Sequence, residues 1–415
     1  MRNTAPTAQP ADKLGNISFI AFTLTQYLGA FNDNVFKQMM LFMALSISAD
    51  DKQGVVMVIF SVPFLLFSGM AGLVSERFSK TTVMRASKVG EWVIMGLGAL
   101  GFYLQSWELL LFTLFLMGTQ STFFGPAKYG AIPEIVQTSL LVKANGIVQM
   151  TTFLAIILGM AFAGILTDSL KGQLWWAGVI CMGISILGIL TVYQIKPRQA
   201  NRPDIPFGIN PFGNMGRSLK KIWHDKPLLD TVIAASFFWF SGGIVTQAIN
   251  NYGTRLLGLD ERSTSFLLAA LSAGIMLGCL LCSLIEKKLG SKRTIILGGV
   301  CVAVGEGLLY FTSMPMGMIY TSLLLAGIGS GLYYVPMAAY MQAKPPLGEK
   351  GEILGAINFC NYIGIVGSGL VWTALTKLDI PANWSLVGLA LSLVVLIVVM
   401  LPQLGHLDES LDHET

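Results

Sequence analysis

The stretch Phe123-Phe124-Gly125-Pro126 has a counterpart, Tyr333-Tyr334-Val335-Pro336, that begins 210 residues later. Two further pairs of segments share this offset: Glu76-Arg77 with Glu286-Lys287, and Ala144-Asn145-Gly146-Ile147 with Leu354-Gly355-Ala356-Ile357. Three chance matches would rarely share one offset, so the sequence predicts two related halves.

Composition places both halves in a membrane. Of the 415 residues, 53% are hydrophobic and 12% are charged, and the mean hydropathy is +0.66, whereas roughly a quarter of a soluble chain is charged. Apolar stretches of about 20 residues can cross the hydrocarbon core as helices. We expect an all-α membrane protein with twelve spans, at about 17–47, 54–75, 81–105, 107–125, 143–166, 174–195, 228–257, 263–285, 293–312, 316–342, 353–376 and 383–404.

Basic residues alternate between connectors and predict the topology. They cluster after the second, fourth and eighth spans and in the connector 196–227, so these segments and both termini should be cytoplasmic. This divides the chain into an N-terminal six-helix half (1–195), a cytoplasmic linker (196–227) and a C-terminal six-helix half (228–415). Within the linker, Met215 to His224 could form an amphipathic helix on the anionic inner leaflet, or a plain solvated segment. The net charge of +4 gives no indication of nucleic-acid binding.

Two parallel six-helix repeats joined by a basic loop resemble the plan of the major facilitator superfamily, in which substrate lies between the halves. The segment Gly72-Leu-Val-Ser-Glu-Arg-Phe-Ser-Lys80 is similar to that superfamily's loop signature, with Glu76 for Asp and Ser79 for Gly. Glu76, Arg77 and Lys80 could form a charge network that gates alternating access, and Glu286 begins its repeat. Charges that only set topology are the alternative.

The first span carries an unusual number of polar residues. Charged groups at membrane depth are costly, so they should face a substrate or each other. Asp33 and Lys37 are four residues apart and can pair on one helical face, and Gln26 lies on the same side as Asp33. We expect Gln26, Asp33, Asn34 and Lys37 to bind substrate, with a structural ion pair as the alternative.

Other polar residues lie inside predicted spans. We assign Gln149, Gln247, Asn250, Asn358 and Asn361 to substrate binding, although each could instead tie helices together. Glu306, between two glycines, is a candidate coupling residue with helix packing as its alternative. Cys279 and Cys282 read as ordinary buried thiols, and no metal or cofactor is expected. The sequence has neither a Walker-type phosphate loop nor a histidine within a span.

Three segments resemble one family more closely: Gly29-Ala-Phe-Asn-Asp-Asn34, Gly125-Pro-Ala-Lys-Tyr-Gly130 and Leu141-Val-Lys-Ala-Asn-Gly146. They are similar to the F-x-D-N, P-A-K-Y-G and V-K-A-N-G elements of the bacterial lysophospholipid transporters. The resemblance implies Asp33 and Asn34 at a headgroup site and Lys128 with Tyr129 at the cytoplasmic mouth. A basic residue that we expect on the seventh span of that family is replaced by the Thr246-Gln247 region.

The resemblance implies transport of lysophospholipids, chiefly lysophosphatidylethanolamine, from the outer to the inner leaflet of the bacterial inner membrane. A separate cytoplasmic acyltransferase would then restore the missing acyl chain, and we expect the transporter to be a monomer among membrane lipids. The chemistry of Asp33, Lys37 and the neighbouring amides suits a zwitterionic headgroup. The alternatives are proton-coupled export of a siderophore or amphiphilic drug, and a membrane scaffold or receptor that does not transport. No constellation of residues predicts an enzyme.

Overall fold

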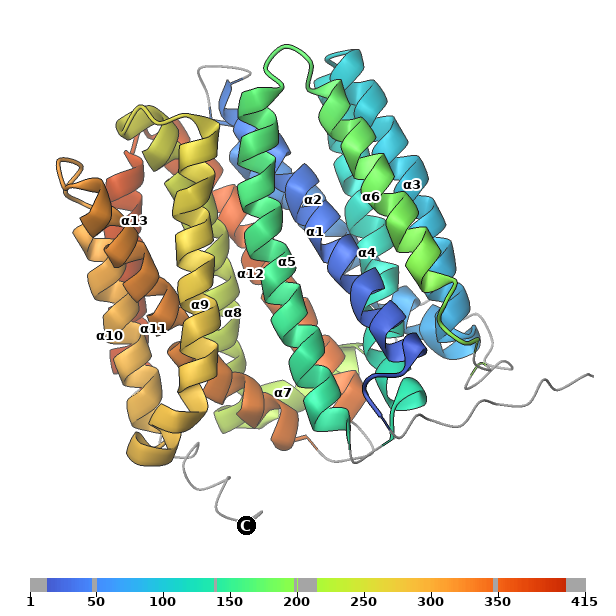
Figure 1. Cartoon of the computed structure of the whole chain (residues 1–415). Coiled ribbons are helices and arrows are strands. Elements are labelled where there is room, and N and C mark those ends of the chain that lie inside the picture. Colours follow the sequence, from blue (N-terminus) through green and yellow to red (C-terminus); the bar gives the residue numbers. More distant parts are fainter. Residues whose placement is uncertain are drawn as a thin grey trace, which may run out of the picture. The chain divides into compact units, whose positions relative to one another are not determined.

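The computed structural model describes residues 13–46, 51–137, 140–197, 200, 215–345 and 350–400. These residues form thirteen α-helices, followed through the sequence colours in Figure 1. Their bounds are α1 Ile17–Ser46, α2 Gln53–Arg77, α3 Lys80–Tyr103, α4 Trp107–Ile135, α5 Leu141–Ser169, α6 Trp175–Val192, α7 Met215–His224, α8 Lys226–Asn251, α9 Glu261–Leu289, α10 Ser291–Leu308, α11 Met316–Ala343, α12 Lys350–Lys377 and α13 Ala382–Met400. A π-helical turn, η2 (Tyr252–Leu256), continues α8.

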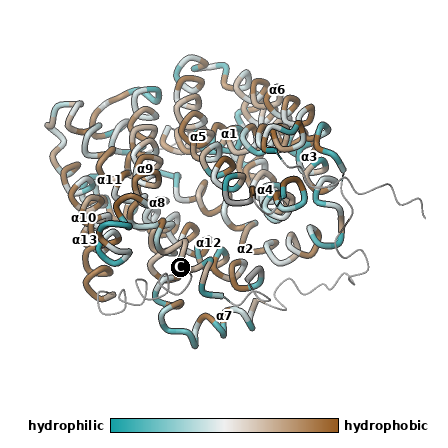
Figure 2. Tube along the Cα trace, turned by 60° about the horizontal axis from the view of Figure 1, so that its bottom comes forward, coloured by the Kyte–Doolittle hydropathy of each residue, from teal (hydrophilic) through white to brown (hydrophobic). Residues whose placement is uncertain are grey.

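Twelve of these helices are long, and they correspond to the twelve predicted spans, while α7 has only ten residues. Nine are long and apolar enough, by length and composition, to cross a membrane, as counted over the described residues. The other three long helices are α1, α3 and α10, each of which contains polar and charged residues. Figure 2 shows hydrophobic residues along much of the long helices. The least apolar helices are therefore where functional groups are expected.

The predicted bounds hold within a few residues at most ends, but the fourth span was predicted too short. Helix α4 does not stop at Gly125; it continues through Pro126 and Pro133 to Ile135. Proline removes one backbone hydrogen bond, which neighbouring groups in a membrane helix can compensate. As a result, Lys128 and Tyr129 lie inside a helix and not in a loop.

The chain packs into two compact units. Unit 1 comprises Met1–Lys37, Val62–Gly159 and Ser169–Pro211, and unit 2 comprises Gln38–Ser61, Met160–Asp168 and Phe212–Thr415. Because α1, α2 and α5 each contribute to both, these boundaries follow packing and not the internal repeat. The division at a linker over 196–227 stays a prediction.

Close helix packing positions the elements within each unit. In unit 1, α3 lies beside α6 and contacts α4 (Figure 1). In unit 2, Gly274 of α9 and Gly327 of α11 bring the two backbones together so closely that a Cβ on either would meet the other helix. Such small residues replace the hydrophobic driving force that is missing between helices in lipid. The predicted helix over Met215–His224 is confirmed as α7, which packs against α8 and α12.

Candidate functional site

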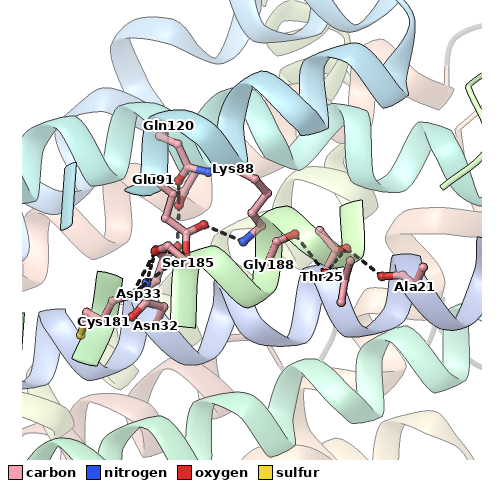
Figure 3. Close-up of polar contacts among 12 residues, drawn as sticks. Ala21, Thr25, Asn32, Asp33, Lys88, Glu91, Gln120, Cys181, Ser185 and Gly188 are labelled. Atoms are coloured by element: carbon pink, nitrogen blue, oxygen red, sulfur yellow. Dashed lines mark hydrogen bonds and ion pairs between the residues drawn. The ribbon is translucent and has the colours of Figure 1, made fainter. Parts of the chain in front are cut away.

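Three consecutive polar residues in the middle of α1 form hydrogen bonds in different directions within unit 1. Successive residues of an α-helix are about 100° apart around its axis, so the side chains of Asn32, Asp33 and Asn34 point in different directions. Asn32 reaches α3 and α6, and Asp33 accepts a hydrogen bond from Ser121 of α4 at 2.5 Å. Asn34 donates to the carbonyl of Ala30 on its own helix. Figure 3 shows Asn32 and Asp33 within this polar cluster.

The polar cluster that includes Asn32 is centred on the carboxylate of Glu91. Lys88 pairs with Glu91 Oε2 at 2.6 Å, and Asn32 donates to Oε1 at 3.0 Å. Ser185 of α6 also donates to Oε1, at 3.3 Å. Both charged side chains are 1% exposed, and Figure 3 draws the contacts between them. A charge this deeply buried persists only when it is paired and hydrogen-bonded, as Glu91 is.

Sequence reasoning missed this cluster. Lys88 is one of the basic residues that follow the second predicted span, and neither it nor Glu91 is among the predicted site residues. The signal was present, because an acid and a base three residues apart inside an otherwise apolar span can pair on one helical face. Room for the Lys88 side chain comes from Gly29 of α1, where a Cβ would collide with the lysine ammonium.

A second polar cluster of unit 1 joins α1, α4 and α5. Gln26 donates to Thr151 at 2.6 Å and accepts from Thr152 at 2.9 Å, so both ends of its amide are used between helices. Lys128 donates to Thr152 at 3.3 Å, and its ammonium lies 5.2 Å from the centroid of the Tyr129 ring. Gln26 thus stabilises the contact of α1 with α5, while Lys128 is held beside it.

Lys128 differs from the other buried lysines of this region in its partners. It is 8% exposed, whereas Tyr129 beside it is 55% exposed. Among the residues that the structure describes, the Lys128 ammonium forms no ion pair. Lys37 is also close enough to Asp33 for their charges to interact, as predicted from their spacing.

Lys80, which was predicted to join a charge network with Glu76 and Arg77, forms an ion pair with a residue of another helix. Lys80 begins α3, is 3% exposed, and pairs with Glu134 of α4 at 2.7 Å. Helix α2 extends to Arg77, so only Phe78 and Ser79 separate it from α3. Glu76 and Arg77 therefore lie in the last turn of α2 and not in a loop. In the repeat, Glu286 accepts a hydrogen bond from Ser291 at the start of α10. Whether these groups gate transport stays a prediction.

Two of the residues assigned to substrate binding are exposed in the structure. They are Gln149 on α5 and Asn358 on α12. Their helices are apolar on most sides, so the sequence alone does not show which side is covered by other helices. Asn361, one helical turn beyond Asn358, is buried at 6% and accepts a hydrogen bond from Ser236 of α8.

The amides of α8 take part in helix packing within unit 2. The Gln247 side chain donates to the backbone carbonyl of Gly243, and the backbone carbonyl of Gln247 accepts from the Gln53 side chain. Asn250 accepts from Gln38 and donates to Gln53. Both residues are fully buried. These contacts fit the alternative, structural interpretation of Gln247 and Asn250, and their part in substrate binding stays a prediction.

Glu306 lies in the last turn of α10 and is 4% exposed. Its Oε2 accepts no hydrogen bond from the described part of the chain. Gly305 next to it allows close contact with α11. The coupling role of Glu306 stays a prediction. Among the described residues, no group of three His, Cys, Asp or Glu side chains could hold a metal ion.

Long apolar helices with charged groups buried among them define a polytopic membrane protein. The chain belongs to the Major Facilitator Superfamily, whose family model matches residues 15–369.

Curated relatives bear the family name that the three sequence motifs indicated. The lysophospholipid transporter LplT of Enterobacter sp. (strain 638) is 25% identical over 92% of this chain and 98% of its own length. The protein of the same name from Escherichia coli (strain K12 / DH10B) is 26% identical, over 88% of this chain and 94% of its own. The resemblance to lysophospholipid transporters is thereby confirmed.

Solved structures agree on the fold. A point mutant of the nucleoside transporter NupG superposes with a TM-score of 0.74 at 11% identity, over 94% of this chain and all of that one. A bacterial homologue of the human lysosomal transporter Spinster gives a TM-score of 0.68 at 13% identity, over 94% of this chain and 97% of its own. At these identities the likeness establishes the major facilitator fold alone.

Proposed function

We propose that this protein moves lysophospholipids, chiefly lysophosphatidylethanolamine, from the outer to the inner leaflet of a bacterial inner membrane. The names of the relatives support this substrate class, and the superfamily fold supports transport by alternating access. A separate acyltransferase on the cytoplasmic side would consume the product. The basic loops support a cytoplasmic location for both termini.

The observation that carries the proposal is the buried Lys128 ammonium without an ion-pair partner among the described residues. Burying an unpaired cation costs free energy, so such a group favours binding of an anion. A lysophospholipid supplies that anion in its phosphate. Thr152 and the Tyr129 ring hold the ammonium in place but leave its charge uncompensated.

Asp33 supplies the complementary charge for an ethanolamine headgroup. Its Oδ2 accepts a hydrogen bond from Ser121, while its Oδ1 accepts none from the described residues. A zwitterionic headgroup needs an acceptor for its ammonium and donors for its phosphate, and unit 1 contains both. Each charge-assisted hydrogen bond to such a headgroup contributes about 1.5–3 kcal/mol. The acyl chain needs only apolar side chains, which the helices provide.

The test compares transfer of labelled lysophosphatidylethanolamine between leaflets of proteoliposomes for the wild type, Lys128→Gln and Lys128→Arg. Loss of the charge in Lys128→Gln should weaken transfer by about tenfold or more, and Lys128→Arg should retain part of it. Lys288→Gln, on the exposed end of α9, is the matched control and should match the wild type.

The same assay separates this proposal from proton-coupled export. Transfer should proceed without a proton gradient and respond to Lys128. A transport activity that requires the gradient and is unaffected by Lys128→Gln would instead favour the export of an amphiphilic solute.

A further inference from the structure

Helix α7 is short, strongly amphipathic and joined almost directly to a spanning helix. Only Asp225 separates its end at His224 from Lys226, the first residue of α8, and the Asp225 carboxylate caps α8 by accepting a hydrogen bond from Leu228. The helix contacts α8 and α12, and Figure 1 draws it across the direction of α8. Since α8 crosses the membrane, α7 is held at the level of the membrane surface.

One face of α7 is fixed by packing within unit 2. Ser218 and Ile222 are each 2% exposed, and Ile222 belongs to a hydrophobic core that also includes residues of α8, α11 and α12. Met215 and Leu219 pack against the same core. The orientation of the helix about its own axis is therefore determined.

The remaining face carries cations and one large aromatic residue. Arg217, Lys220 and Lys221 are exposed, and Trp223 is 72% exposed. The ten residues of α7 include no acidic side chain. The exposed face thus presents three cations that belong to α7 itself.

The order of side chains around α7 matches an interface between apolar and polar surroundings. At about 100° per residue, Trp223 lies about 40° beyond Leu219, and Lys220 lies about 60° further on. The tryptophan therefore marks the boundary between the packed apolar face and the basic face. Tryptophan concentrates at the headgroup level of membranes, and basic side chains beside it attract anionic lipid.

We propose that the exposed face of α7 is a binding site for anionic phospholipid headgroups, formed by Arg217, Lys220 and Lys221 with Trp223 at the interface. The ligand is a lipid with net negative charge, such as phosphatidylglycerol, bound through its phosphodiester. Charge complementarity selects it over a zwitterionic lipid, which has no net charge to attract. This site is separate from Lys128 and Asp33 and does not depend on the transported substrate.

Quenching of tryptophan fluorescence by brominated lipids tests the proposal without any transport assay. The protein is reconstituted in phosphatidylcholine vesicles that contain equal mole fractions of either brominated phosphatidylglycerol or brominated phosphatidylcholine. The signal of Trp223 is obtained as the difference between the wild type and Trp223→Phe. We expect phosphatidylglycerol to quench this signal more strongly, since each cation near an anionic membrane surface strengthens binding to it about fivefold.

Charge variants show whether the three cations are responsible. In a triple variant with Arg217→Gln, Lys220→Gln and Lys221→Gln, the excess quenching by phosphatidylglycerol should disappear. A triple variant with Arg217→Lys, Lys220→Arg and Lys221→Arg should keep it, as should the control pair Lys287→Gln and Lys288→Gln at the end of α9. Equal quenching by both lipids, no quenching by either, or an excess that survives in the glutamine variant would overturn the proposal. Lysophospholipid transfer could fail while this quenching holds, so the two proposals fail separately.

Discussion

The side-chain amide of Gln38 donates a hydrogen bond of 2.8 Å to the side-chain carbonyl of Asn250, 212 residues further along the chain. Asn250 in turn donates to Gln53 at 2.8 Å, and Gln53 donates to Asp51 at 3.0 Å. Asn251 donates to the same carboxylate at 2.9 Å. This chain of hydrogen bonds, all within unit 2, joins the end of α1 and the start of α2 to α8.

Replacing Asn250 with alanine should destabilise the protein. The change leaves the Gln38 amide and the Gln53 carbonyl without partners at positions that are fully buried. In water such a loss costs about 1–3 kcal/mol, but in membrane proteins one side-chain hydrogen bond averages about 0.6 kcal/mol. We expect about 1 kcal/mol, because two bonds are lost, measured as a lower midpoint of thermal unfolding in detergent.

The matched control for this change is Asn383→Ala, whose exposed amide donates only to the carbonyl of Tyr310. It should leave the midpoint nearly unchanged. Equal effects of the two substitutions would contradict a stabilising role for the buried chain of amides.

Glycine substitutions within α11 should have opposite effects. A Cβ at Gly327 would meet the Leu271 carbonyl and the Gly274 backbone of α9, whereas a Cβ at Gly317 has nothing within 4 Å. Gly327→Ala should therefore cost about 1–3 kcal/mol through overpacking. Gly317→Ala should be neutral or stabilise by up to about 1 kcal/mol, since alanine is the better helix former. The midpoints of thermal unfolding of the two variants measure these effects. An unchanged midpoint for Gly327→Ala would show that α9 and α11 can separate at little cost.

The buried pair Lys88 and Glu91 should be more sensitive to single than to double substitution. Lys88→Met leaves the Glu91 carboxylate without its cation at 1% exposure, and breaking such a pair costs about 3–5 kcal/mol. The double variant with Lys88→Met and Glu91→Met removes both charges and should be less destabilised. The yield of folded protein and the midpoint of thermal unfolding show which of the two variants is less stable. A double variant worse than Lys88→Met would mean that Glu91 retains its stabilising contacts, with Asn32 and Ser185, when the lysine is absent.

The less buried pair offers a comparison for that experiment. Lys80 and Glu134 have side chains 4% and 20% exposed, so water can partly solvate the carboxylate when its partner is removed. Lys80→Met should therefore cost less than Lys88→Met, in line with the weaker energetics of partly exposed ion pairs.

The fold was predictable because its determinants are local and repeated. Length and hydropathy give the spans, and the segments repeated at one offset relate the halves, so the twelve long helices and the superfamily followed from the sequence. The internal extension of α4 was missed, because Pro126 usually ends a helix and only the surrounding packing shows that it does not.

The site was less predictable because pairing depends on how helices face one another. The polar turn at Asn32, Asp33 and Asn34 was visible in the sequence, but its partners Glu91, Ser121 and Ser185 lie on three other helices. For the same reason the sequence did not identify Glu134 of α4 as a partner of Lys80. An equal limit applies to Gln149 and Asn358, since an amide inside an apolar span does not reveal whether its side of the helix is covered.

The most direct test of lysophospholipid transport uses the wild-type protein in proteoliposomes loaded with labelled lysophosphatidylethanolamine in one leaflet. The appearance of label in the opposite leaflet is followed with protein, with protein-free vesicles and with a labelled diacyl phosphatidylethanolamine. We expect transfer of the lysolipid well above the protein-free rate, and little transfer of the diacyl lipid. Folded protein that moves neither lipid faster than protein-free vesicles would contradict the account.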